Sequence, residues 1–182
     1  MKLEKTYIEG LYVIEPQVFR DERGWFMESH SNDQFSAAGV SIRFIQDNHS
    51  YSSEKYTLRG LHCQVDPCAQ TKLVRCTRGS VWDVAIDLRR HSQTYLKWLG
   101  IELSEENQLQ LLVPKGFAHG FVTLQDDTEV QYKVDTVYSR NHDRTIRYDD
   151  PSFDIDWKVQ PTILSDKDRT APYFKDSDII FD

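Results

Sequence analysis

The chain has 182 residues, of which 39% are hydrophobic, 28% charged and 12% aromatic. These proportions are typical of one soluble globular domain, 1–182, that buries a core without disulfide support, and they argue against disorder. The formal net charge of −7 opposes binding to nucleic acid, although it is compatible with a small anion held in a locally basic pocket.

The start of the chain, MKLEKTYIEG, lacks the apolar run of a signal peptide. No later stretch approaches the roughly 20 apolar residues of a membrane-spanning helix. We therefore expect a cytoplasmic protein with no membrane partner. The cysteines, Cys63, Cys68 and Cys76, are odd in number and lack CxxC spacing, which indicates reduced thiols rather than a disulfide framework or a zinc site.

Short runs of β-branched and aromatic residues recur between turn signals along the chain. A segment at 32–39 and a capped turn at 104–108 carry the main helical signals. We expect strands within 11–16, 44–52, 58–64, 71–79, 80–89, 98–103, 110–116, 118–125 and 128–139. Many short antiparallel strands in one domain favour an all-β fold, a jelly-roll or related barrel with a few short helices, whose interior is a natural ligand cavity.

The segment 80–89 shows the clearest strand periodicity. Its even positions, Trp82, Val84, Ile86 and Leu88, alternate with a more polar set that includes Asp83. The alternation predicts that this strand buries its even face.

The stretch LRGLHCQ at 58–64 places an arginine and an imidazole within a strand of otherwise buried character. On a regular strand Leu58, Gly60, His62 and Gln64 share one face, whereas Arg59 points to the other. A bulge at Gly60 would bring Arg59 towards the side of His62.

Other strands offer polar groups that could face the same cavity, namely Lys72, His119, Tyr132 and Tyr138. Taken alone, each fits a structural role, because buried histidines are usually hydrogen-bonded and buried tyrosines usually pack with a wet tip. Taken together, histidine as base, lysine as oxyanion stabiliser and tyrosine as acid can remove a proton beside a ketone and return one to the other face. The combination predicts an epimerase.

A metal site is the chemical alternative, because PKGFAH at 114–119 matches half of the motif of metal-binding cupins. The other half, an HxH pair followed by glutamate, is missing: Gln64 follows His62 and Cys63, and Cys68 and Ala69 stand where the acid is needed. Transition metals usually take three or more protein ligands, so we rank metal-free catalysis first and expect no metal and no cofactor.

An ordered series of motifs closely resembles the dTDP-4-dehydrorhamnose 3,5-epimerase family. The motifs are FRDERGWFMES (19–29), FIQDNHSYS (44–52), LRGLHCQ (58–64), TKLV (71–74), GSVWDVAIDLR (79–89), LVPKGFAHGF (112–121), DPSFDIDW (150–157) and ILSDKD (163–168). The resemblance covers nearly the whole chain. It implies a cofactor-free homodimer with a cupin-type jelly-roll fold that converts the nucleotide sugar dTDP-4-keto-6-deoxyglucose to dTDP-4-keto-rhamnose in deoxysugar synthesis.

The resemblance also implies roles for individual residues. His62 would remove the protons on carbons 3 and 5, and Asp168 would be its carboxylate partner. Lys72 would stabilise the enolate oxygen at carbon 4, Tyr132 would be the acid opposite His62, and Tyr138 would assist the rearrangement of the sugar ring.

Further positions match the family's binding contacts. Arg23 and Arg59 would pair with the diphosphate, since a planar guanidinium suits phosphate oxygens. The N-terminal segment would cross to the partner subunit and supply its arginine and aromatic contacts. The remaining expected substrate contacts are Phe26, Glu28, Gln46, Asn48, His119 and Lys167.

Two departures bear on specificity. Cys63 and Cys68 flank the expected active strand, and Asp143 stands where the family often carries glutamate. Relatives with this scaffold epimerise one carbon only or accept other nucleotide sugars, which leaves a one-carbon epimerase as an alternative. A non-catalytic nucleotide-sugar-binding cupin and a metal-dependent cupin oxygenase are alternatives of other classes, and a base opposed by an acid argues against the mere binder.

Overall fold

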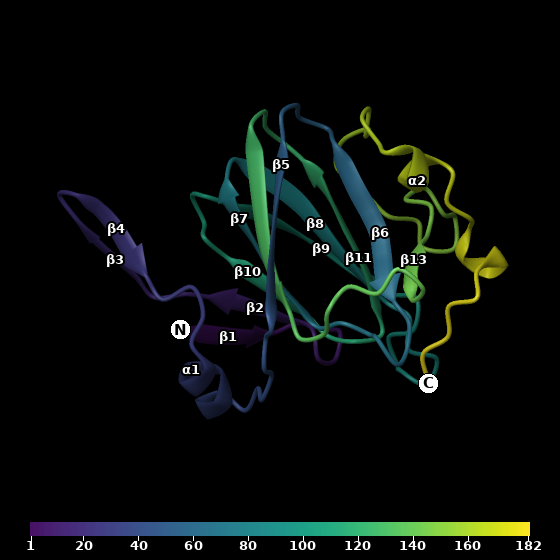
Figure 1. Ribbon diagram of the computed structural model, residues 1–182. Helices are drawn as coiled ribbons and strands as arrows, with labels where there is room; N and C mark the ends of the chain where they lie inside the picture. Colours follow the sequence, from purple (N-terminus) through teal and green to yellow (C-terminus); the bar gives the residue numbers. More distant parts are fainter.

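Two antiparallel sheets face each other in the computed structural model, which describes residues 1–182 (Figure 1). The first sheet has the order β1 (Lys2–Lys5), β2 (Tyr12–Glu15), β10 (Gln110–Val113), β7 (Lys72–Arg78), β12 (Thr128–Val134) and β5 (Gln46–Ser52). The second has the order β13 (Asp143–Thr145), β6 (Leu58–Gln64), β11 (Phe117–Thr123), β8 (Ser80–Asp87) and β9 (Trp98–Ser104). Every neighbouring pair is antiparallel, which confirms the predicted all-β barrel.

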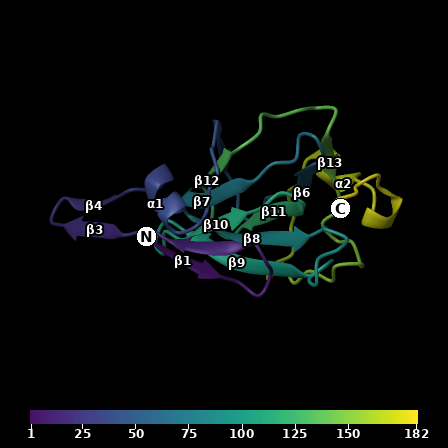
Figure 2. The same ribbon diagram turned by 90° about the horizontal axis from the view of Figure 1, so that it is seen from below.

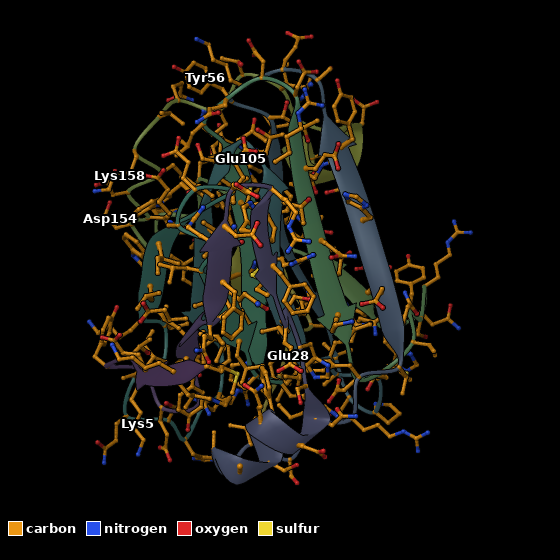
Figure 3. The ribbon with its side chains drawn as sticks, turned by 90° about the vertical axis from the view of Figure 1, so that its left-hand side faces the viewer. Lys5, Glu28, Tyr56, Glu105, Asp154 and Lys158 are labelled. Atoms are coloured by element: carbon orange, nitrogen blue, oxygen red, sulfur yellow. The ribbon has the colours of Figure 1, made fainter.

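A third, two-stranded sheet extends away from the barrel. It is the hairpin of β3 (Val18–Asp21) and β4 (Gly24–Met27), which projects from the body in both ribbon views (Figures 1 and 2). Figure 3 looks at the molecule from the side of this hairpin, with Glu28 near α1 and Tyr56 at the opposite end of the barrel.

The helices are short. The predicted helical segment forms α1 (Asn32–Ala37), which Ser31 caps at its N-terminus, and a second helix, α2 (Asp166–Arg169), has Ser165 as its cap. A single 3₁₀ turn, η1 (Phe174–Asp176), follows. The expected capped turn at 104–108 is a turn in which the Ser104 hydroxyl accepts from the backbone N–H of Asn107 at 3.0 Å. None of these helices is long and apolar enough to span a bilayer.

The central strands of the five-stranded sheet, β8 and β11, are buried on both faces. The outer face of this sheet forms an apolar cluster with residues of the C-terminal segment, such as Trp157 and Phe181. The predicted apolar side of β8 lies in this cluster, where Val84, Ile86 and Leu88 are fully buried. The odd positions of β8 face the barrel interior instead. The apolar cluster there joins both sheets and includes Val74, Val81, Ala85, Leu111, Phe117, Phe121 and Val130.

A bulge interrupts the pairing of β6 with β11. His62 pairs with His119, but Arg59 pairs with Phe121, so three steps on β6 match two on β11. Gly60 sits at the shift with φ +138°, and a Cβ there would lie 2.5 Å from Cα of Gly120. Only glycine accommodates this backbone and this close approach. The predicted bulge is confirmed, and regular alternation along β6 is broken at Gly60.

Candidate active site

A cavity of about 510 Å³ opens between the two sheets and α2. Strands from both sheets contribute polar side chains to it, and α2 lies at its rim. The charged and titratable residues that line it are Arg59, His62, Lys72, His119, Tyr132, Lys167 and Asp168. The structure therefore brings together residues that are more than 100 positions apart in the chain, such as His62 and Asp168, with a separation of 106.

The imidazole of His62 is held by the carboxylate of Asp168. Nε2 of His62 lies 2.6 Å from Oδ1 of Asp168, whose side chain is only 4% exposed. The N-cap hydroxyl of Ser165 accepts from the backbone N–H of Asp168 at 3.1 Å and fixes the start of α2. Burial raises the pKa of Asp168, but hydrogen bonds from His62 and Ser165 outweigh it and hold the pKa below its ordinary value. An ionised Asp168 can orient the ring and stabilise its protonated form.

Lys72 supplies a cation that has no carboxylate partner. It reaches across from β7, and its Nζ lies 3.5 Å from the backbone carbonyl oxygen of His62. No carboxylate oxygen lies within 4.0 Å of it among the ion pairs of the structure. Enclosure in the protein lowers the pKa of Lys72, while the charges of Cys63, Asp143 and Asp83 act to raise it. An unpaired ammonium in a protein cavity is suited to stabilise a developing oxyanion.

Tyr132 comes from the sheet opposite His62. It is on β12, it lines the same cavity, and its hydroxyl has no hydrogen-bond partner in the protein. Burial raises the pKa of Tyr132; the charge of Arg59 lowers it and that of Asp143 raises it. The phenol therefore stays protonated at neutral pH and can act as an acid.

A second histidine–aspartate pair lies beside the first. Nε2 of His119 is 2.9 Å from Oδ1 and 3.0 Å from Oδ2 of Asp83, a fully buried residue of β8. The sequence pointed to His119 but not to Asp83. Asp83 falls at an odd position of the alternating segment 80–89. The alternation assigns the odd positions to the more polar face, and it does not indicate that this face points into the barrel.

Arg59 of β6 is a further cation in the lining of the cavity. Its Nε donates to the Ser52 hydroxyl at 3.3 Å and its Nη2 to the backbone oxygen of Tyr51 at 2.9 Å. Neither partner is an acid, so its charge is available to an anion. Ser50, which lines the cavity on the neighbouring strand β5, adds a hydroxyl.

Several expected contacts lie outside this cavity. Arg23 and Phe26 are on the hairpin, where Arg23 pairs with Asp21 at 2.6 Å and Phe26 is 66% exposed. Glu28 follows the hairpin and accepts a hydrogen bond from Gln34 of α1. None of the three lines the cavity of its own chain.

Gln46 and Asn48 also lie outside the lining of the cavity. They are on the face of β5 that carries Ser50, and the Gln46 amide donates to Asn48 Oδ1 at 2.8 Å. They therefore extend the polar face of β5 beyond the lining residues.

Tyr138 and Lys167 meet at Asp143. Tyr138 lies beyond the end of β12, is 58% exposed, and donates to Oδ2 of Asp143 at 3.2 Å. The ammonium of Lys167 pairs with the same carboxylate oxygen and also lines the cavity. Lys167 is therefore at the rim of the cavity, whereas Tyr138 is outside its lining.

The side chains present do not fit a transition-metal site. His62 and His119 are cross-strand neighbours, but no three histidine, cysteine or acidic residues gather in a geometry that could hold an ion. Transition metals in proteins usually take at least three such ligands. The donor set therefore gives no support to the metal-dependent oxygenase.

Comparison with known proteins assigns the family. Residues 5–176 match the family model described as dTDP-4-dehydrorhamnose 3,5-epimerase. A relative of that name from Shigella flexneri is 50% identical over 179 residues, which cover 98% of each chain.

Solved structures agree with the sequence match. The dTDP-4-dehydrorhamnose 3,5-epimerase of Bacillus anthracis, with TDP and pyrophosphate bound, has a TM-score of 0.93 and 47% identity over 95% of this chain and 99% of that one. The dTDP-6-deoxy-D-glucose-3,5-epimerase of Legionella pneumophila, in complex with dTDP-4-keto-L-rhamnose, has a TM-score of 0.92 and 41% identity over 97% of this chain and 94% of that one. These neighbours also confirm the cupin-type jelly roll. The chain therefore belongs to the dTDP-4-dehydrorhamnose 3,5-epimerase family and is an epimerase, an enzyme of the isomerase class.

Proposed function

We propose that this epimerase inverts carbons 3 and 5 of dTDP-4-keto-6-deoxyglucose, and so forms dTDP-4-keto-rhamnose, with His62 as base and Tyr132 as acid. The observation that carries this proposal is that His62 and Tyr132 line one cavity from opposite sheets, and that Lys72 lines the same cavity. Inversion needs a proton to leave one face of a carbon and another to arrive on the opposite face, and two opposed groups meet that need.

The first step is deprotonation beside the ketone. His62 takes the proton from carbon 3, and the electron pair of the broken C–H bond moves to form an enolate with its negative charge on the oxygen at carbon 4. The unpaired ammonium of Lys72 donates a hydrogen bond to that oxygen, and Asp168 stabilises the protonated imidazole.

The second step returns a proton to the other face. The enolate collapses as carbon 3 takes the phenolic proton of Tyr132, and the double bond to the carbon 4 oxygen reforms. His62 then loses its proton and Tyr132 regains one, both by exchange with solvent. The same pair of steps follows at carbon 5, so the net change is inversion with no gain or loss of electrons.

Arg59 binds the diphosphate in this proposal. Its guanidinium lines the cavity and has only a hydroxyl and a carbonyl as partners. Lys167 at the rim and His119 within the cavity add polar contacts to the substrate. Gln46 and Asn48 on β5, together with Tyr138, contact the nucleotide part beyond the cavity.

The active enzyme is a cytoplasmic homodimer in which each hairpin completes the partner's site. Arg23 and Phe26, with Glu28 behind them, lie on a segment that projects from its own barrel (Figure 2). The guanidinium of Arg23, whose acidic partner is the neighbouring Asp21, and the exposed ring of Phe26 suit the phosphate and base of a bound nucleotide sugar.

Turnover in deuterated water tests the proposed mechanism. Because both new protons come from solvent-exchangeable groups, product formed in D₂O should carry deuterium at carbon 3 and at carbon 5, as read by proton NMR or mass spectrometry. Label at one carbon only would establish the one-carbon epimerase. Product without label would contradict proton transfer through an enolate.

The variant Tyr132→Phe separates the two steps. It keeps the ring but removes the donor, so His62 can still form the enolate while inverted product becomes scarce. We expect exchange of the substrate protons for deuterium to continue while epimerisation falls. If Tyr132→Phe epimerised at the wild-type rate, the acid would be another residue. If the unmodified chain showed no turnover at all, the result would favour the non-catalytic binder.

A further inference from the structure

We propose that Asp143 is a positioning residue for the reaction: it holds Lys167 of α2 and so fixes the neighbouring Asp168 against the proposed base, His62. The inference rests on the proposed function, because it concerns how the carboxylate partner of His62 is kept in place. It adds to that function a residue that is not among the side chains lining the cavity.

Two successive residues attach α2 to two neighbouring strands. Oδ1 of Asp168 lies 2.6 Å from Nε2 of His62 on β6, and Nζ of Lys167 lies 2.5 Å from Oδ2 of Asp143 on β13. β13 pairs with β6, and α2 lies on the side of the barrel that these strands form (Figures 1 and 2). Because a helix of four residues is not stable by itself, its position depends on contacts of this kind.

The register of β13 places Asp143 on the side of the sheet that carries His62. Thr145 is the cross-strand neighbour of His62, and Asp143, two residues earlier, is the neighbour of Gln64. Paired residues of an antiparallel sheet project to the same face, and so do residues two apart along one strand. The two attachment points of α2 therefore lie on one face of the sheet, one strand apart. A single contact would leave the helix free to turn about it, whereas two contacts fix its orientation.

The carboxylate of Asp143 is itself well held. Its Oδ2 accepts a hydrogen bond from the Tyr138 hydroxyl at 3.2 Å as well as one from Lys167. The side chain of Asp143 is 14% exposed, whereas that of Lys167 is 52% exposed. Asp143 thus joins three parts of the chain, namely β13, α2 and the segment that follows β12. It provides a defined anchor for a long and flexible lysine side chain.

A direct contact with the substrate does not explain this carboxylate. Asp143 does not line the cavity, and its negative charge would repel the diphosphate of the proposed substrate. Its ion pair with Lys167 also reduces the positive charge that this lysine can offer to a phosphate. The pair therefore serves the placement of α2 better than it serves the binding of an anion.

The first test is the variant Asp143→Asn, which keeps the size of the side chain and removes its charge. We expect kcat to fall about 3-fold to 10-fold, because a partly exposed ion pair contributes modestly and its loss acts on the placement of Asp168. KM should change by less than about 2-fold, since no substrate contact is removed. A rise in KM larger than the fall in kcat would make Asp143 a substrate contact and overturn the proposal.

The conservative variant Asp143→Glu keeps the carboxylate. We expect its kcat to stay within about 2-fold of the wild type, because the longer side chain can still pair with Lys167. If Asp143→Glu were as slow as Asp143→Asn, the ion pair would not be the cause of the loss.

A double-mutant cycle shows whether Asp143 acts through Asp168. In an Asp168→Asn background the carboxylate that α2 presents to His62 is already gone, so adding Asp143→Asn should change the rate by less than about 2-fold. Incorporation of deuterium into the nucleotide sugar gives a rate for slow variants. If the separate effects of the two substitutions multiply, Asp143 acts elsewhere and the proposal fails.

Asp178→Asn is the matched control. Oδ1 and Oδ2 of Asp178 accept from Arg144 at 2.6 and 2.7 Å, so this pair also ties β13 to the C-terminal segment. Neither residue lines the cavity. We expect kcat at the wild-type level, with any loss confined to the melting temperature. A fall in kcat equal to that of Asp143→Asn would mean that general attachment of β13 supports catalysis, and not its link to Lys167.

Lys167→Met breaks the same ion pair from the side of α2 and covers the case in which Asp143→Asn does not fold. We expect kcat to fall as in Asp143→Asn, with no further loss when Asp168→Asn is added; an unchanged kcat would overturn the proposal. The wild-type label separates this result from the proposed function. Deuterium at carbons 3 and 5 together with a multiplicative cycle would reject the role of Asp143 alone, whereas unlabelled wild-type product would reject both.

Discussion

The two histidines of the cavity have hydrogen-bond partners within their own chain, whereas the large apolar side chains of the β3–β4 hairpin are mostly exposed. In the cavity, Asp168 holds His62 at 2.6 Å and Asp83 holds His119 at 2.9 Å. On the hairpin, Phe19, Trp25 and Phe26 are 54%, 52% and 66% exposed. The proposed base His62 is therefore held in place within its own chain, whereas the aromatic side chains of the hairpin remain largely exposed.

The largest effect should come from His62→Asn, which attacks the cavity alone. We expect kcat to fall about 10³-fold or more, because the proposed base acts mainly in the transition state. Binding of dTDP, measured by calorimetry, should stay close to that of the wild type. Substantial turnover by His62→Asn would mean that another residue is the base, and the cavity could no longer be described as holding a fixed base.

Paired glycine substitutions compare the rigidity of the two regions. Gly60→Ala should lower the free energy of unfolding by about 2–4 kcal/mol, because its Cβ would meet backbone atoms of Gly120 and the left-handed φ adds strain. Gly24→Ala on the hairpin has φ +127° but no atom within 4 Å, so we expect only about 1 kcal/mol. Equal losses in chemical denaturation would show that packing at Gly60 adds nothing beyond backbone strain.

Mixing two complementary variants tests whether the hairpin serves the partner. Arg23→Ala should raise KM about 10-fold, since it removes a proposed phosphate contact and keeps His62. When Arg23→Ala and His62→Asn chains are unfolded together and refolded, the mixed dimers hold one site with both residues intact. At a substrate concentration far below KM, where the Arg23→Ala sites contribute little, random pairing then restores about one quarter of wild-type activity. No recovery, with mixed dimers verified by mass spectrometry, would assign Arg23 to its own chain or to no site.

The smallest effect concerns the dependence of stability on pH. The folded-state pKa of Asp168 is held below its unfolded value, so its contribution to stability is present above a pH of about 4 and is lost as pH falls through the folded pKa. Asp168→Asn lacks this contribution. We expect urea denaturation to show wild type more stable than the variant at pH 6, by about 1–2 kcal/mol, and the difference to shrink towards pH 3. A difference that stays constant over this range would mean that Asp168 is not stabilised as an anion.

The barrel strands could be predicted because their residues alternate or are β-branched. The strands that escaped prediction, β1, β3, β4 and β13, are short and lack that pattern, as in KLEK or DRT. β1 pairs with the neighbouring β2, and β3 pairs with β4, so their pairing is local, whereas β13 pairs with the distant β6.

The site divides in the same way. The cavity positions of Arg59 and His62 follow from the bulge that Gly60 indicated. The contact of Asp168 with His62 had no signal in periodicity, because a separation of 106 residues leaves none, and only the family resemblance pointed to it. Asp83 was missed because alternation predicts that the more polar face of a strand is exposed, whereas both faces of β8 are buried.

The C-terminal segment that covers the outer face of the five-stranded sheet also carries Asp168, so the proposed partner of His62 is synthesised later than the strands that line the cavity. A ribosome releases the strands bearing His62, Lys72 and Tyr132 well before α2, since chains emerge from the N-terminus. A nascent chain at that stage has the imidazole without its carboxylate and an apolar sheet face open to water. Docking of the C-terminal segment supplies the carboxylate and covers the apolar face together, so a chain interrupted before α2 lacks the proposed partner of His62.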